Sequence, residues 1–269
     1  MTSTHTSRIY EQELSDLKTR ILAMGGRCEQ LIQMASRALE KRDIDLAHRV
    51  EATDRAINVE EMNIDQMTVR ILALRQPVGR DLRFLVTALK VVTDLERIGD
   101  EAVNIAERAA ELAAEAPIPA LQTQLRELAD AAGVMVRRAL DSFVAEDEKQ
   151  ATEVLRADDA VDAMYGQVLR DSMEYIRQNP ERVNDGWRYA SCAKYLERVA
   201  DHATNIAEMV VFMVSGADVR HHASAMGGTG SIADEISAGV VRRADPTQLR
   251  RPGELGTAAE IEAETPIKE

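Results

Sequence analysis

Apolar residues recur at intervals of three and four over most of the chain, which is the period of an amphipathic helix. Two examples are ILAMGGRCEQLIQMASRALEK at residues 21–41 and LRELADAAGVMVRRAL at residues 125–140. No segment alternates Val, Ile and Thr with polar residues in the way that a half-buried strand does. The pattern therefore predicts an all-α protein.

Prolines mark the breaks between these helices, because proline lacks an amide donor and clashes with the preceding turn. Four of them precede residue 216, namely Pro77, Pro117, Pro119 and Pro180. Together with the cap residue Asp43 and the acidic segment AEDEK, they predict six helices, over residues 8–41, 44–75, 78–115, 119–146, 149–178 and 185–215. Long helices with short connections pack as antiparallel neighbours, so we expect bundles.

The character of the chain changes at Gly216. Half of the 14 glycines and three of the seven prolines lie in residues 216–269, where apolar residues are scattered. Such a composition buries too little apolar surface to offset the cost of ordering the chain. We therefore expect residues 216–269 to form a mobile tail, with one short helix near residues 232–243.

An internal repeat divides the helical part into two halves. Residues 94–107 read DLERIGDEAVNIAE and residues 195–208 read YLERVADHATNIAE, with nine of 14 positions identical. The offset of 101 residues is close to half of the helical part. The sequence therefore predicts a duplication of a three-helix unit, with one copy at residues 8–115 and the other at residues 118–215.

The repeated polar residues form a column on one face of each helix. Glu, Asp and Asn recur at i, i+4 and i+8, as Glu96, Asp100 and Asn104 in one copy and as Glu197, Asp201 and Asn205 in the other. Residues four apart on a helix are neighbours, so the two carboxylates repel unless a positive charge lies between them. Carboxylate and amide oxygens suit a hard cation such as magnesium, manganese or iron, and zinc is a further candidate.

The other half of each site is expected on the antiparallel neighbour, where residues equally distant from the turn lie side by side. A turn centred on Pro77 pairs Glu96 with Asn58 and Asp100 with Asp54. A turn near Pro180 pairs Glu197 with Asp162 and Asp201 with Asp158. The sequence thus predicts two metal sites, a first cluster of Asp54, Asn58, Glu96 and Asp100 and a second cluster of Asp158, Asp162, Glu197 and Asp201, with Asp94, Glu61 and Asp159 as nearby contributors.

An ordinary solvated helix face is the alternative explanation of these carboxylates, since exposed helix faces are rich in charge. Arg97 and Arg198 lie next to the repeated carboxylates and would then neutralise them as ion pairs. A ferritin-like di-iron centre is disfavoured, because it needs Glu-x-x-His on two helices and only Asp45-x-x-His48 approaches that motif.

Charge and cysteine content narrow the class of protein further. Asp and Glu number 46 against 33 Lys and Arg, a net charge of −13, which disfavours direct binding to nucleic acid or to an anionic membrane surface. The two cysteines, Cys28 and Cys192, suit a reducing compartment and are expected to pack as small apolar groups. We find no secretory signal and no apolar run long enough to span a bilayer, so we expect a cytoplasmic location.

The chain resembles the PhoU family over residues 8–215. The resemblance rests on LERIGDEAVNIAE, on LERVADHATNIAE, on RQPVGRDLRFLVTALK at residues 75–90 and on the duplicated three-helix plan. It implies two three-helix bundles side by side, with metal clusters held by the Glu96/Asp100 and Glu197/Asp201 motifs. Asn58 departs from a fully acidic first site.

The resemblance also implies a function. Members of the family damp phosphate uptake and keep the phosphate-starvation response off, through contacts with the Pst transporter ATPase and the PhoR sensor kinase, and homodimers are common. We therefore expect a non-enzymatic regulator with these partners. The alternatives are a binding module for another phosphate carrier or kinase and, ranked lower, a di-metal enzyme acting on phosphoesters.

Overall fold

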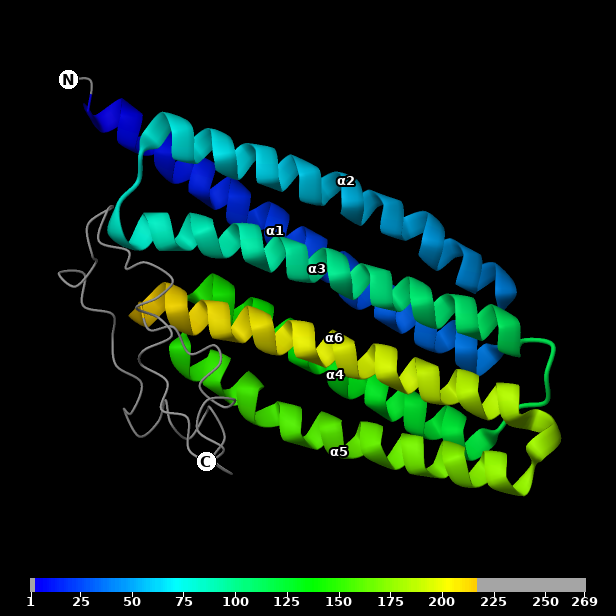
Figure 1. Cartoon of the computed structure of the whole chain (residues 1–269). Coiled ribbons are helices and arrows are strands. Elements are labelled where there is room, and N and C mark those ends of the chain that lie inside the picture. Colours follow the sequence, from blue (N-terminus) through cyan, green and yellow to red (C-terminus); the bar gives the residue numbers. More distant parts are fainter. Residues whose placement is uncertain (1–2, 217–269) are drawn as a thin grey trace, which may run out of the picture.

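The computed structural model describes residues 3–216, which form six long α-helices (Figure 1). Their bounds are α1 Ser3–Lys41, α2 Ile44–Arg75, α3 Gly79–Leu112, α4 Pro119–Ala145, α5 Glu148–Gln178 and α6 Val183–Ser215. A short 3-10 helix, Pro180–Arg182, precedes α6. No strand occurs within these residues, so the all-α prediction is confirmed.

The helix ends follow from local chemistry. Asp43 and Asp147 cap α2 and α5, because each carboxylate accepts hydrogen bonds from amides of the first turn that have no partner within the helix. Pro119 stands in the first turn of α4, where its missing amide costs nothing. The helix α6 ends at Ser215 and is capped by Gly216, whose φ of 76° lies in the left-handed region that favours glycine.

Two predicted helix ends differ from the structure by three residues or more. The first helix begins at Ser3 rather than at residue 8, since no proline or glycine interrupts the polar segment before it. The third ends at Leu112 rather than at residue 115, and turns lead from there to Pro117. The predicted tail and its short helix, at residues 217–269, lie outside the described residues.

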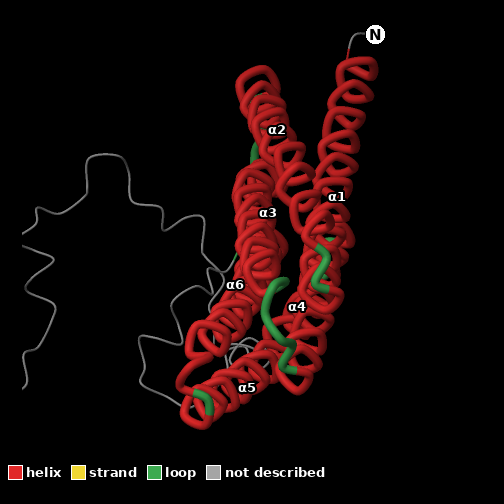
Figure 2. The backbone as a smooth tube through the Cα atoms, turned by 90° about the vertical axis from the view of Figure 1, so that its right-hand side faces the viewer, coloured by secondary structure: helices red, strands yellow, loops and turns green. Residues whose placement is uncertain are grey.

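Two antiparallel three-helix bundles lie side by side, one formed by α1, α2 and α3 and the other by α4, α5 and α6 (Figures 1 and 2). They pack through α3 against α6 and through α1 against α4, which leaves α2 and α5 at the outer edges. This arrangement confirms the prediction of two tandem three-helix bundles. No helix within residues 3–216 has both the length and the apolar character needed to cross a membrane.

Aliphatic side chains fill both bundles and the seam between them. One continuous buried cluster runs through all six helices and includes Leu17, Ile98, Val136 and Val199. The helices α1 and α4 approach closely at Gly25, where a Cβ atom would lie 2.2 Å from Cδ1 of Leu140. Burial of this apolar surface is the main force that stabilises the fold.

Candidate metal centres

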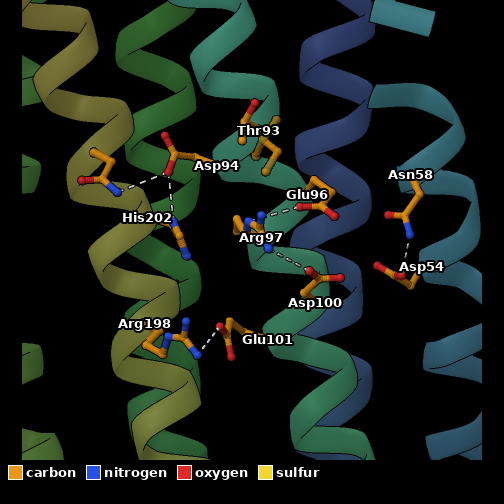
Figure 3. Close-up of polar contacts among 12 residues, drawn as sticks. Asp54, Asn58, Thr93, Asp94, Glu96, Arg97, Asp100, Glu101, Arg198 and His202 are labelled. Carbon is orange, nitrogen blue, oxygen red and sulfur yellow. Dashed lines mark hydrogen bonds and ion pairs between the residues drawn. The ribbon is translucent and has the colours of Figure 1, made fainter. Parts of the chain in front are cut away.

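The antiparallel hairpin of α2 and α3 brings the four residues of the first cluster together (Figure 3). Asp54 and Asp100 turn toward each other between α2 and α3, and Asn58 lies level with Glu96. Asp54 fits there because its neighbour on α3 is Gly99, at which a Cβ atom would lie 2.6 Å from Asp54 Oδ1. The register expected from the turn at Pro77 therefore places these side chains as the sequence indicated.

Negative charge in the first cluster is poorly compensated. Burial and the charge of Asp100 raise the pKa of Asp54. Burial and the charge of Asp100 likewise raise the pKa of Glu96, and burial and Asp65 raise the pKa of Glu61. A raised carboxyl pKa means that the site disfavours the ionised form unless a cation is added.

Arg97 forms ion pairs with the first cluster and neutralises it only in part. Its guanidinium lies 3.6 Å from a carboxylate oxygen of Glu96 and 3.7 Å from one of Asp100, distances too long for hydrogen bonds. Its side chain is also more than half exposed, where an ion pair contributes little. Ion pairing to Arg97 lowers the pKa of Glu96 but does not cancel the rise caused by burial and by the charge of Asp100.

Three buried oxygens of α2 on this side of the helix have no hydrogen-bond partner in the structure. They are Oδ1 of Asp54, Oδ1 of Asn58 and Oδ1 of Asp65. A buried acceptor without a partner costs free energy. Such oxygens, gathered with carboxylates of raised pKa, are the donor set that a hard cation satisfies.

The second cluster forms in the same way between α5 and α6. Burial, followed by the charges of Asp162 and Asp201, raises the pKa of Asp158 to about 7. Burial and the charge of Glu197 raise the pKa values of both Asp162 and Asp201. Oδ1 of Asp158 is again a buried oxygen with no hydrogen-bond partner. The two repeats thus hold equivalent acidic clusters.

One lysine distinguishes the second cluster. Nζ of Lys194 lies 2.7 and 2.6 Å from the two carboxylate oxygens of Glu197, whereas the equivalent position in the first repeat is Thr93. Lys194 pairs with Glu197 but does not relieve the charge around Asp158, whose pKa is still raised by burial and by Asp162 and Asp201. A cation entering the second cluster would compete with Lys194 for Glu197.

Asn104 and Asn205 have other partners. Nδ2 of Asn104 donates to a carboxylate oxygen of Glu101 at 3.1 Å, and Nδ2 of Asn205 donates to Asp94 at 3.2 Å. Each four-residue step along a helix turns the side chain by about 40°, so the third member of the column has rotated toward the seam between the bundles. Both asparagines, and Asp94 with them, have hydrogen-bond partners outside the two carboxylate clusters.

The seam between α3 and α6 carries a polar network that sequence reasoning missed (Figure 3). Arg198 bonds to the buried Glu101 at 2.9 Å, not to the second cluster. Nδ1 of His202 lies 2.9 Å from Oδ1 of Asp94. Glu101 and His202 occupy equivalent positions in the repeat. Arg198 therefore has a carboxylate partner on α3, whereas its equivalent Arg97 has a histidine at the matching position of α6.

Two residues that lie beside the clusters, and that the sequence analysis did not name, could have been found from their spacing. Asp65 follows Glu61 by four residues and so continues the column Asp54, Asn58, Glu61. Lys194 precedes Glu197 by three residues, the spacing of an ion pair on one helix. Within residues 3–216, no three His, Cys, Asp or Glu side chains are already arranged as a metal-binding group.

Other reactive groups pack in the core. Cys28 and Cys192 are fully buried, as expected, and Sγ of Cys28 donates to the carbonyl of Leu95 at 3.2 Å. Burial raises the pKa of the Cys192 thiol to about 12, so this thiol is not a nucleophile at neutral pH.

Comparison with known proteins gives one consistent result. The PhoU domain matches residues 21–109 and 125–210, one match in each bundle. Two relatives, from Pseudomonas putida and Pseudomonas aeruginosa, are named as homologues of the phosphate-specific transport system accessory protein PhoU. Each is 41% identical to this chain over 217 residues, which cover 81% of this chain. The alignment covers 85% of the Pseudomonas putida protein and 90% of the Pseudomonas aeruginosa protein.

Solved structures agree with this assignment. The crystal structure of PhoU from Pseudomonas aeruginosa is 40% identical, with a TM-score of 0.74 over 77% of this chain and 99% of its own. The phosphate transport system regulatory protein PhoU from Streptococcus pneumoniae is 26% identical, with a TM-score of 0.72 over 78% of this chain and 98% of its own. With both bundles matched in sequence and in fold, this chain belongs to the PhoU family.

Proposed function

We propose that this protein restrains phosphate uptake and keeps the phosphate-starvation response off when phosphate is plentiful. The observation that carries the proposal is the match of both bundles to PhoU proteins, whose names describe accessory and regulatory proteins of phosphate transport. The protein acts by contact with the transporter ATPase and with a PhoR-type sensor kinase, and not by catalysis. Its net charge of −13 favours protein partners over nucleic acid.

The protein works in the cytoplasm as a homodimer and carries metal in both acidic clusters. Asp54, Glu96 and Asp100 would hold a cation in the first bundle, with the amide oxygen of Asn58 as a weaker ligand. Asp158, Asp162, Glu197 and Asp201 would hold one in the second. Iron, manganese, magnesium and zinc are the candidates, and the partnerless oxygens of Asp54, Asn58 and Asp158 support this use of the clusters. A bound cation would supply the positive charge that lets the helix pairs pack without repulsion.

Deletion of the gene tests the regulatory role. Cells without the protein should take up more phosphate and express starvation genes in phosphate-rich medium, and the wild-type gene should restore both. Unchanged uptake and unchanged expression would contradict the proposal. A pull-down with the purified protein distinguishes this function from binding to a different phosphate carrier or kinase. If the proposal holds, the protein should retain the transporter ATPase.

A further inference from the structure

Lys194 brings a positive charge to the second cluster. Its Nζ lies 2.7 and 2.6 Å from the two carboxylate oxygens of Glu197, whose side chain is only 13% exposed. Burial raises the pKa values of Asp162 and Asp201, and the charge of Lys194 opposes this rise. The ammonium group therefore acts on three of the four residues of the cluster, as a counter-ion of the whole site and not only as one half of a surface ion pair.

The first cluster has no such group at the equivalent position. The shift of 101 residues that aligns Glu96 with Glu197 places Thr93 opposite Lys194. The guanidinium of Arg97 lies 3.6 Å from a carboxylate oxygen of Glu96, too far for a hydrogen bond. Both oxygens of Glu197 thus accept from an ammonium group already, whereas Arg97 leaves those of Glu96 open to another ligand.

A second exchange between the repeats accompanies the lysine. Asp54 and Asp158 align at a shift of 104 residues, which places Glu61 opposite Tyr165. Nζ of Lys194 lies 5.5 Å from the centroid of the Tyr165 ring, within the range of a cation–π contact. The second repeat therefore has an aromatic ring that holds the ammonium group where the first repeat has a further carboxylate. The two exchanged residues touch each other, so together they change the charge of one site.

We propose that Lys194 sets the order in which the two clusters take up metal, because it is a tethered cation that must leave Glu197 before that carboxylate can bind a metal ion. The first cluster then fills at a lower free metal concentration than the second. The side chain of Lys194 is 49% exposed on a flexible stem, so its ammonium group can move into water. The inference rests on the proposed function, since both clusters must bind metal, and goes beyond it by naming the residue that makes their affinities differ.

Manganese alone is the probe, held at defined free concentrations by a metal buffer. Equilibrium dialysis of the full chain, followed by elemental analysis, counts the ions bound. Each cluster is measured in a background that disables the other. Glu96→Gln/Asp100→Asn leaves only the second cluster intact. Glu197→Gln/Asp201→Asn leaves only the first.

Lys194→Thr is added to both backgrounds, because threonine is the residue that the first repeat has at this position. The matched control is Lys149→Thr, which makes the same change of charge. Lys149 is an exposed residue of α5, nine positions before Asp158 and so about 14 Å from it along the helix. At this distance its charge is largely screened by salt.

In the background with only the second cluster, Lys194→Thr should lower the manganese concentration at half-saturation by about tenfold, since a charge-assisted hydrogen bond no longer competes. Lys149→Thr should change it by less than about twofold. In the background with only the first cluster, Lys194→Thr should also have less than about a twofold effect. Damage to the fold would not tighten binding. With chelator and without metal, Lys194→Thr should melt at a lower temperature than Lys149→Thr, because the cluster has lost its counter-ion.

Three results would overturn this inference and leave the metal sites standing. They are equal affinities of the two clusters when Lys194 is present, an affinity of the second cluster that Lys194→Thr does not change, and an equal gain in both backgrounds. A melting temperature in chelator that Lys194→Thr does not lower would also overturn it, because the ammonium group would then be no counter-ion of the cluster. Absence of bound manganese in both backgrounds would overturn the inference together with the metal binding on which it rests.

Discussion

Replacing Asp158 by asparagine tests the electrostatics of the second cluster. Burial and the charges of Asp162 and Asp201 raise the pKa of Asp158 from 3.8 to about 7. Between these two values the folded protein holds the proton and the unfolded chain does not. The free energy of unfolding therefore falls as pH rises from about 4 to about 7, provided that no metal is present. The substituted side chain carries no charge at any of these pH values, so this fall should shrink in Asp158→Asn.

The magnitude follows from the same values. Each pKa unit corresponds to about 1.4 kcal/mol, so an ionised Asp158 destabilises the metal-free folded state by at most about 4 kcal/mol at pH 8. Neighbouring side chains and water relax around the charge, which reduces the expected gain on Asp158→Asn to about 1–3 kcal/mol. With a saturating cation the sign should reverse, because the variant lacks a ligand.

The assay is urea unfolding followed by circular dichroism at pH 5 and pH 8, with chelator and then with added manganese. Asp130→Asn, an exposed change on α4 with the same effect on net charge, is the control. Asp158→Asn should be more stable than the wild type at pH 8 in chelator, and its gain at pH 5 should be less than half as large, because only part of the pH range between the two pKa values has then been crossed. If it shows no gain at pH 8, or if Asp130→Asn shows the same gain, the second cluster is not a site of uncompensated repulsion.

Two further changes test the seam and the first cluster. Arg198→Leu leaves the carboxylate of Glu101, which is 3% exposed, without its ion pair but with its hydrogen bond from Asn104, so urea unfolding should show a loss of about 1–3 kcal/mol. Adding Glu101→Leu should recover most of it, and failure to recover would contradict this account. Gly99→Ala places a Cβ atom 2.6 Å from Asp54 Oδ1 and should cost about 1–3 kcal/mol. The control Gly26→Ala meets no atom within 4 Å and should gain up to about 1 kcal/mol; equal effects would refute the close contact.

Local chemistry made most of the fold predictable. Proline, capping aspartates and apolar spacing act within one helix or one turn, so six helices and their hairpins follow from the sequence. The register of each hairpin follows as well, since the turn at Pro77 leaves few ways to align Asp54 with Asp100. Duplication then extends the same argument to the second bundle.

The contacts across the seam were not predictable in this way. The partner of Arg198 depends on how α3 packs against α6, which brings together residues about a hundred positions apart, and no turn fixes that register. Counting in steps of four residues also included Asn205 in the acidic column, whereas the rotation of the helix places its side chain at Asp94. The alternative of simple ion pairing by Arg198 was wrong for the same reason.

Metal content of the purified full chain tests the central proposal most directly. Elemental analysis should find iron, manganese, magnesium or zinc in stoichiometric amount, and the variant Glu197→Gln/Asp201→Asn should lose the share held by the second cluster. The control Glu127→Gln/Asp130→Asn, two exposed acids on α4, should retain it. A wild-type protein that holds no metal, and whose melting temperature does not change when divalent cations are added, would contradict the assignment of these clusters as metal centres.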